Sequence, residues 1–72
     1  MALVVFDSMG QVVEPGTKVL STRGESATLI RATRAQEIGR SGKVYVQWDK
    51  DGYKQEYYDN IVFDLHVKDI PQ

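Results

Sequence analysis

The sequence of 72 residues predicts an all-β domain with little or no helix. Two observations favour this class. Glycine and proline recur at short intervals, and the segments between them have the length of strands and are rich in β-branched and aromatic residues. No window of about a dozen residues keeps the apolar period of a helix, so a helical or mixed fold is disfavoured.

The N-terminal elements follow from apolar runs separated by turn residues. Residues 2–13 predict a hairpin, with Gly10 in its turn because glycine adopts a positive φ without steric cost. Pro15 and Gly16 predict a second turn, and residues 18–21 predict the strand that follows it.

The next predicted strand, 27–33, contains two adjacent residues that both favour burial, Leu29 and Ile30. Since successive side chains of a strand point to opposite faces, burying both requires a bulge or a bend. We therefore expect a long bent strand shared between two small sheets. Residues 33–42 are the longest irregular segment, where a polar loop is favoured over one or two helical turns.

The C-terminal half predicts a second hairpin and one further strand. Residues 43–48 alternate between two faces, 49–52 form a four-residue loop that ends in glycine, and 53–58 return. A turn at 59–60 precedes the last strand, where alternate residues of 63–67 point inward. The predicted core comprises Val5, Val19, Leu29, Ile30, Val44, Val46, Trp48, Tyr57, Phe63 and Leu65.

Length and composition limit both the domain organisation and the chemistry. The chain predicts one domain over residues 1–72, in which 1–15 are an N-terminal hairpin extension and 16–70 form a small barrel of about five strands. A core this small leaves little room for a deep catalytic cavity. The absence of cysteine excludes disulfides and thiolate metal sites, and a single histidine, His66, excludes multi-histidine zinc sites. We therefore expect neither an enzyme nor a bound metal or cofactor.

The formal net charge of −1 hides a basic centre between acidic ends. Residues 18–43 hold six Lys or Arg against two Glu. This centre is either a local anion-facing patch or a solvated surface whose counter-charges fold alongside it. No apolar run is long enough to span a membrane, and the N-terminus lacks the features of a signal peptide, so we expect a cytoplasmic protein.

Five aromatic residues fall on the hairpin predicted for residues 43–58. Tyr45 and Tyr58 are predicted to project from the face opposite Trp48 and Tyr57, where they either stiffen the sheet by cross-strand packing or contact a partner. For a protein partner, the candidate contact residues are Arg23, Glu25, Arg34, Arg40, Tyr45 and Tyr58. For nucleic acid, the candidates are Lys18, Arg31, Arg34, Arg40, Lys43 and Tyr45.

Several motifs resemble a Src-homology-3-like (SH3-like) small β-barrel of the KOW or Tudor kind. They are Gly-Thr-Lys-Val at 16–19, Gly-Lys-Val-Tyr-Val-Gln-Trp-Asp at 42–49 and Glu-Tyr-Tyr at 56–58. Together with Phe-Asp at 6–7, Arg-Gly-Glu at 23–25 and Val-Phe-Asp-Leu at 62–65, they resemble short proteins without an assigned activity that are encoded by bacteriophages of actinobacteria and by their hosts. The resemblance implies a small phage or prophage protein in the bacterial cytoplasm.

We therefore predict a non-enzymatic protein-interaction module, such as a phage accessory protein that acts on a host or phage protein. One alternative is a small barrel that binds single-stranded DNA or RNA or acts in transcription, as KOW barrels do. The net charge of −1 argues against a protein dedicated to binding double-stranded nucleic acid, because contacts between basic residues and phosphates supply most of the non-specific affinity. A Tudor-like cage for a methylated cation would have to come from Tyr45, Trp48, Tyr53 and Tyr57. A structural or assembly protein of a phage, able to self-associate, is the third alternative.

Overall fold

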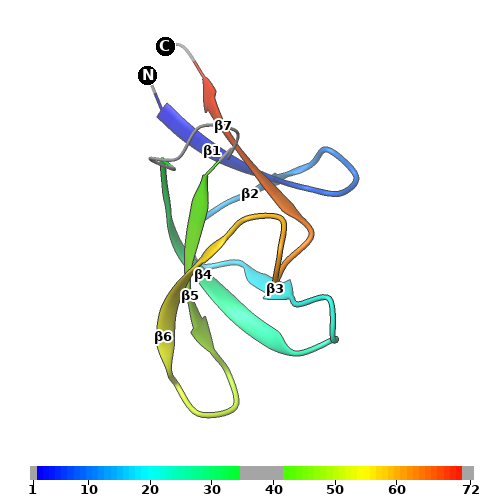
Figure 1. Ribbon diagram of the computed structural model, residues 1–72, viewed down its shortest axis with the longest axis vertical. Coiled ribbons are helices and arrows are strands. Elements are labelled where there is room, and N and C mark those ends of the chain that lie inside the picture. The colour runs from blue at the N-terminus through cyan, green and yellow to red at the C-terminus, as the bar shows by residue number, and fades with distance from the viewer. Residues whose placement is uncertain (1, 35–41, 71–72) are drawn as a thin grey trace.

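The computed structural model describes residues 2–34 and 42–70 of the chain. Within these residues it has seven strands and no helix, arranged as two small antiparallel sheets (Figure 1). The strands are β1 (Ala2–Asp7), β2 (Val12–Val13), β3 (Lys18–Leu20), β4 (Ser26–Thr33), β5 (Lys43–Trp48), β6 (Lys54–Tyr58) and β7 (Leu65–Ile70). Their order is β2-β1-β7 in one sheet and β3-β4-β5-β6 in the other. The predicted all-β class with an N-terminal hairpin is confirmed, and the two sheets enclose one apolar core as in a small barrel.

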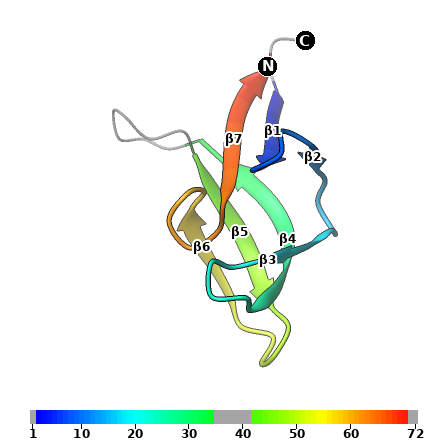
Figure 2. The same ribbon diagram turned by 90° about the vertical axis from the view of Figure 1, so that its right-hand side faces the viewer.

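The longest strand, β4, carries the bulge that the sequence predicts. Its register against β5 shifts between Leu29 and Arg31, so Ile30 is inserted as an extra residue. The strand is strongly curved in Figure 2. Leu29 is buried, whereas Ile30 is only half-buried, so the prediction that Ile30 belongs to the core is wrong: the bulge lets the strand turn Ala32 inward in its place.

The curvature does not divide β4 between the two sheets. It pairs only with β3 and β5, so the expectation that this strand is shared between sheets is also wrong. The bulge absorbs the change of face within one sheet, and no second pairing partner is needed. The question whether 33–42 contains helical turns falls on residues 35–41, which lie outside the described residues.

The core is built from apolar side chains of both sheets. Seven predicted members are buried, and Ala27 and Val67 join them. Trp48 and Tyr57 are only half-buried and pack against the core from its rim. Trp48 stacks on Phe63 with ring centroids 5.5 Å apart, and its Nε1 donates a 2.9 Å hydrogen bond to the Tyr57 hydroxyl. This hydrogen bond satisfies the indole N–H of Trp48, which needs a partner when the ring packs against a core.

One buried carboxylate ties the two sheets together. Asp59 follows β6 and is only 1% exposed. Its backbone N–H donates to the carbonyl oxygen of Gly42 at 3.1 Å, and its carbonyl oxygen accepts from Leu65 N–H at 3.1 Å. Its Oδ2 accepts from Val67 N–H at 2.7 Å. Asp59 therefore links the start of β5 to β7, a role that the predicted turn at 59–60 did not include.

The outermost strands of the chain pair with each other. β1 and β7 run antiparallel from Ala2 opposite Ile70 to Asp7 opposite Leu65. On its other side β1 pairs with β2 only at Val5 and Phe6. The N-terminal hairpin is therefore part of a sheet with the C-terminal strand, and one edge of β1 is only partly covered.

Candidate binding surface

The outer face of the four-stranded sheet carries two tyrosine rings and basic side chains beside them. Val44 and Val46 of β5 are buried, so the strand period of two turns Lys43, Tyr45 and Gln47 outward. The cross-strand register then places further polar residues beside them from β4 and β6. We define the Tyr45 face as Arg31, Thr33, Lys43, Tyr45, Glu56 and Tyr58.

Two cation–aromatic pairs lie side by side on this face. Arg31 is the register partner of Tyr45, and its Cζ lies 4.3 Å from the centroid of the Tyr45 ring. Lys43 is the register partner of Tyr58, and its Nζ lies 5.1 Å from that ring's centroid. Both rings are half-buried, and the predicted projection of Tyr45 and Tyr58 away from the core is confirmed. Each pair contributes about 0.5–1 kcal/mol at a position that remains accessible to solvent.

A carboxylate lies beside one of the two cations. Glu56 is the register partner of Tyr45, and its Oε2 accepts a 2.8 Å hydrogen bond from the Thr33 hydroxyl. Its Oε1 lies 4.0 Å from Lys43 Nζ. The Tyr45 face therefore carries charges of both signs around two aromatic rings, and it is not a uniformly cationic patch.

A second polar cluster lies on the same side of the sheet around Asp49. Lys18 Nζ donates to Oδ1 of this carboxylate at 2.7 Å, and the Ser26 hydroxyl donates to Oδ2 at 2.6 Å. These hydrogen bonds, from Lys18 and then Ser26, hold the pKa of Asp49 below its ordinary value. Lys18 therefore has its counter-charge within the fold.

The predicted residues Arg23 and Glu25 lie elsewhere, in the turn between β3 and β4. Ser21 Oγ accepts from the backbone N–H groups of both residues, at 3.2 Å and 3.1 Å, which fixes the turn. Glu25 accepts a 3.0 Å hydrogen bond from Lys50 Nζ, and this contact raises the pKa of Lys50. The turn borders a groove of about 370 Å³ lined also by Trp48, Ile61 and Val62.

The predicted contact residues therefore divide among three places. Lys18, Arg31, Lys43, Tyr45 and Tyr58 share the outer side of the four-stranded sheet. Arg23 and Glu25 are at the turn, and Arg34 forms an ion pair with Asp69 of β7. The last candidate, Arg40, lies outside the described residues.

Sequence reasoning did not select Glu56 and Thr33 as members of this surface. A signal for Glu56 was present, because a loop at 49–52 brings Trp48 opposite Tyr53 and thereby sets Tyr45 opposite Glu56. Thr33 could not be placed in the same way, since its register depends on the length of the bulge in β4.

In the part of the chain that the structure describes, no three His, Cys, Asp or Glu side chains come together as potential metal ligands. His66 is exposed on β7. Among the same residues, no helix has the length and apolar character needed to cross a membrane. Comparison of the chain with protein-family models, curated proteins and solved structures gave no match.

Proposed function

We propose that this domain is a non-enzymatic protein-interaction module and that the Tyr45 face is its contact surface. The observation that carries the proposal is the pair of cation-covered tyrosines, Arg31 on Tyr45 and Lys43 on Tyr58, with Glu56 opposite Tyr45 and near Lys43. Tyr and Arg are enriched among residues that dominate binding energy at protein interfaces. Rings already held in place by neighbouring strands lose little side-chain entropy on binding.

The charge pattern favours a protein over a polyanion. Glu56 neutralises part of the charge of Lys43, and Asp49 that of Lys18. A phosphate backbone would meet these carboxylates, whereas a protein surface can place an acidic group near Arg31 and a basic group near Glu56. The resemblance to short actinobacteriophage proteins supports a host or phage protein as the partner, met in the bacterial cytoplasm.

A second candidate function is binding of single-stranded nucleic acid. The observation in its favour is that Lys18, Arg31, Lys43 and Tyr45 lie on the same side of one sheet. Exposed rings beside cations can stack bases, and phosphate contacts make such binding strongly salt-dependent.

Affinity capture with matched charge reversals distinguishes these functions. The tagged wild type and the tagged variants Arg31→Glu and Lys68→Glu are each incubated with lysate of an actinobacterial host, with and without nuclease, and the bound proteins are identified. Lys68 is a suitable control because it also covers an aromatic ring, at 5.5 Å from the Phe6 centroid, but on the other sheet. We expect the wild type to capture a partner protein that stays bound after nuclease treatment. The Arg31→Glu variant should no longer capture this partner, whereas the Lys68→Glu variant should still capture it.

Three outcomes would contradict the proposal. A partner retained by Arg31→Glu would show that the Tyr45 face is not the contact surface. Loss of every partner on nuclease treatment, with salt-sensitive binding to a single-stranded oligonucleotide, would favour the second function. Self-association in light scattering, abolished by Arg31→Glu, would favour an assembly protein.

A further inference from the structure

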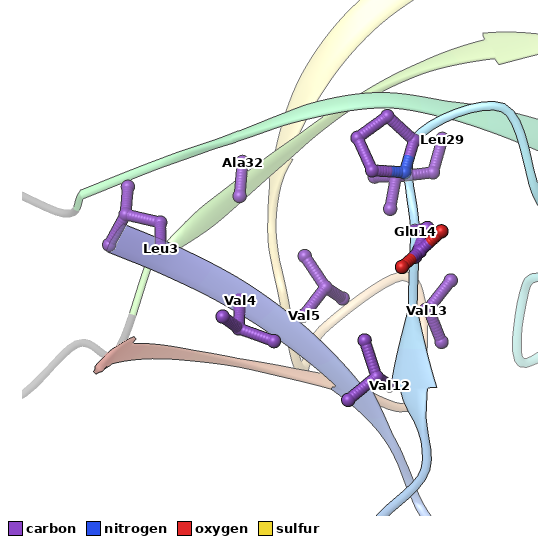
Figure 3. Close-up of a pocket in the computed structure, with 9 residues that line it drawn as sticks. Leu3, Val4, Val5, Val12, Val13, Glu14, Leu29 and Ala32 are labelled. Atoms are coloured by element: carbon purple, nitrogen blue, oxygen red, sulfur yellow. The ribbon is translucent and has the colours of Figure 1, made fainter. Parts of the chain in front are cut away.

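An apolar pocket of about 240 Å³ lies between the N-terminal hairpin and β4, away from the Tyr45 face. Figure 3 shows Leu3 and Ala32 at one end of it and Glu14 near Leu29 at the other. The remaining lining is Val4, Val5, Val12, Val13 and Pro15. Its volume is below the roughly 300–1,000 Å³ of small-molecule sites, so it suits a single large apolar side chain.

The edge of β1 beside this pocket is open. β1 and β2 pair at Val5 with Val13 and at Phe6 with Val12. Continuing that register would place Pro15 opposite Leu3, and proline has no N–H to donate. Among the described residues, the part of β1 before Val5 therefore has no strand partner on this side.

The backbone groups of Leu3 point toward this open edge. Asp7 N–H donates to the Gln11 carbonyl oxygen, at 2.9 Å, on the β2 side of β1. In an antiparallel strand every second residue directs its N–H and C=O to the same side, so Val5 and Leu3 share this direction. Leu3 therefore offers a donor and an acceptor beside an apolar pocket.

A single charge marks the rim of the pocket. Glu14 is exposed, and no ion pair of its carboxylate is found among the described residues. The other residues that line the pocket are uncharged. A basic group on a bound segment would therefore meet a complementary carboxylate at one end.

We propose that the open edge of β1 and this pocket form a strand-addition site for an extended segment of a partner protein. The segment pairs with the backbone of Leu3, inserts one large apolar side chain into the pocket and places a Lys or Arg near Glu14. Main-chain hydrogen bonds supply affinity in this mode, and the pocket supplies specificity. The site does not include the Tyr45 face, so either can be disproved without the other.

The test uses nuclear magnetic resonance on the ¹⁵N-labelled protein with a synthetic probe. The probe is a blocked peptide of alternating Val and Thr with a central Phe and a Lys at each end. We expect shifts of the amide signals of Leu3, Val5, Val13 and Ala32, and slower hydrogen exchange at Leu3. Three control peptides each remove one contact. Pro beside the Phe blocks backbone pairing, Gly in place of the Phe leaves the pocket empty, and Glu at both ends removes the basic group that would lie near Glu14.

Two protein variants test the contacts separately. Glu14→Gln should weaken binding of the Lys-ended peptide about 2- to 5-fold, the range of an exposed ion pair. Asp64→Asn is its matched control, since Asp64 is also exposed but does not line the pocket, and it should bind as the wild type does. Ala32→Leu should fill the pocket and abolish binding, and a thermal unfolding curve shows whether that variant folds.

The proposal is overturned if the probe shifts none of these signals at millimolar concentration. It is equally overturned if the Pro and Gly control peptides bind as well as the probe, because backbone pairing and the pocket then contribute nothing. If the same amide signals shift when the protein is concentrated without any peptide, a second copy of the chain, and not a partner protein, occupies the site. If the Arg31→Glu variant loses the lysate partner but still binds the peptide, the strand-addition site is independent of the proposed function of the Tyr45 face.

Discussion

Replacing Asp59 by Ala should cost this small domain a large part of its stability. The substitution removes the carboxylate that accepts the 2.7 Å hydrogen bond from Val67 N–H. Val67 is 2% exposed, so the substitution leaves its N–H buried without a protein acceptor. An unsatisfied buried donor costs about 1–3 kcal/mol, and a bond to a charged acceptor lies at the upper end of that range. We expect a loss of about 2–3 kcal/mol.

Asp59→Asn refines this prediction. Asn keeps an oxygen acceptor of the same shape but loses the charge, and charge-assisted hydrogen bonds are about twice as strong as neutral ones. We therefore expect roughly half the loss seen with Asp59→Ala. A total stability of about 4–11 kcal/mol is usual for this length, so the Ala variant remains measurable.

Urea and thermal unfolding followed by Trp48 fluorescence measure these losses. For a domain of this size, 1 kcal/mol lowers the midpoint temperature by about 4–8 °C. Hydrogen exchange at the Val67 amide should accelerate in the Ala variant. Asp64→Ala serves as the control, because Asp64 is exposed and a surface change is expected within about 0.5 kcal/mol. If Asp59→Ala unfolds like this control, Asp59 does not hold the two sheets together.

Three further changes test other parts of the fold. Gly42→Ala places a Cβ 2.7 Å from a β7 side chain and should lose about 1–3 kcal/mol in urea unfolding, whereas an unchanged midpoint would exclude the close contact. Tyr57→Phe removes the acceptor of Trp48 Nε1–H and should lose about 0.5–1.5 kcal/mol, with altered tryptophan fluorescence. Lys18 lowers the pKa of Asp49 in the folded protein. The ionised Asp49 therefore stabilises the fold at pH values above the ordinary Asp pKa, and this stabilisation is lost as the pH falls through the lowered pKa of the folded state. Asp49→Asn should therefore destabilise at pH 7 but not in strong acid, and an equal effect at both pH values would contradict the contact.

The two proposed surfaces have different physical requirements from a partner. The Tyr45 face presents rings covered by Arg31 and Lys43, so a partner has to displace or stack on these cations. The edge of β1 presents backbone groups and a pocket, so it accepts an extended segment of suitable pattern. A partner protein that uses both would bind through two separated contacts, whose affinities combine if its geometry allows simultaneous contact.

Local rules account well for the central hairpin. The alternation of residues 43–48 and the glycine at the end of the 49–52 loop correctly predicted β5, β6 and the opposite directions of Tyr45 and Tyr57. Adjacent Leu29 and Ile30 correctly indicated a bulge, because a strand cannot bury two successive side chains on one face.

The same local rules failed where distant segments meet. Which of the two adjacent apolar residues would leave the core depended on the packing of β4 against the other sheet, and Ile30 was the one displaced. Arg34, one of the candidate contact residues, forms an ion pair with Asp69, 35 positions away. No pattern within either segment indicates that pairing.

The sequence by itself determined the all-β class, the positions of most strands and the two faces of the central hairpin, because turn residues and a period of two act within a few residues. Only the tertiary structure decided which basic residues share a surface. It separated Arg23 and Glu25 from Tyr45, gave Lys18 its counter-charge in Asp49 and left an edge of β1 open beside a pocket. These outcomes depend on how the sheets pair and pack, and that is set by contacts between residues far apart in the chain.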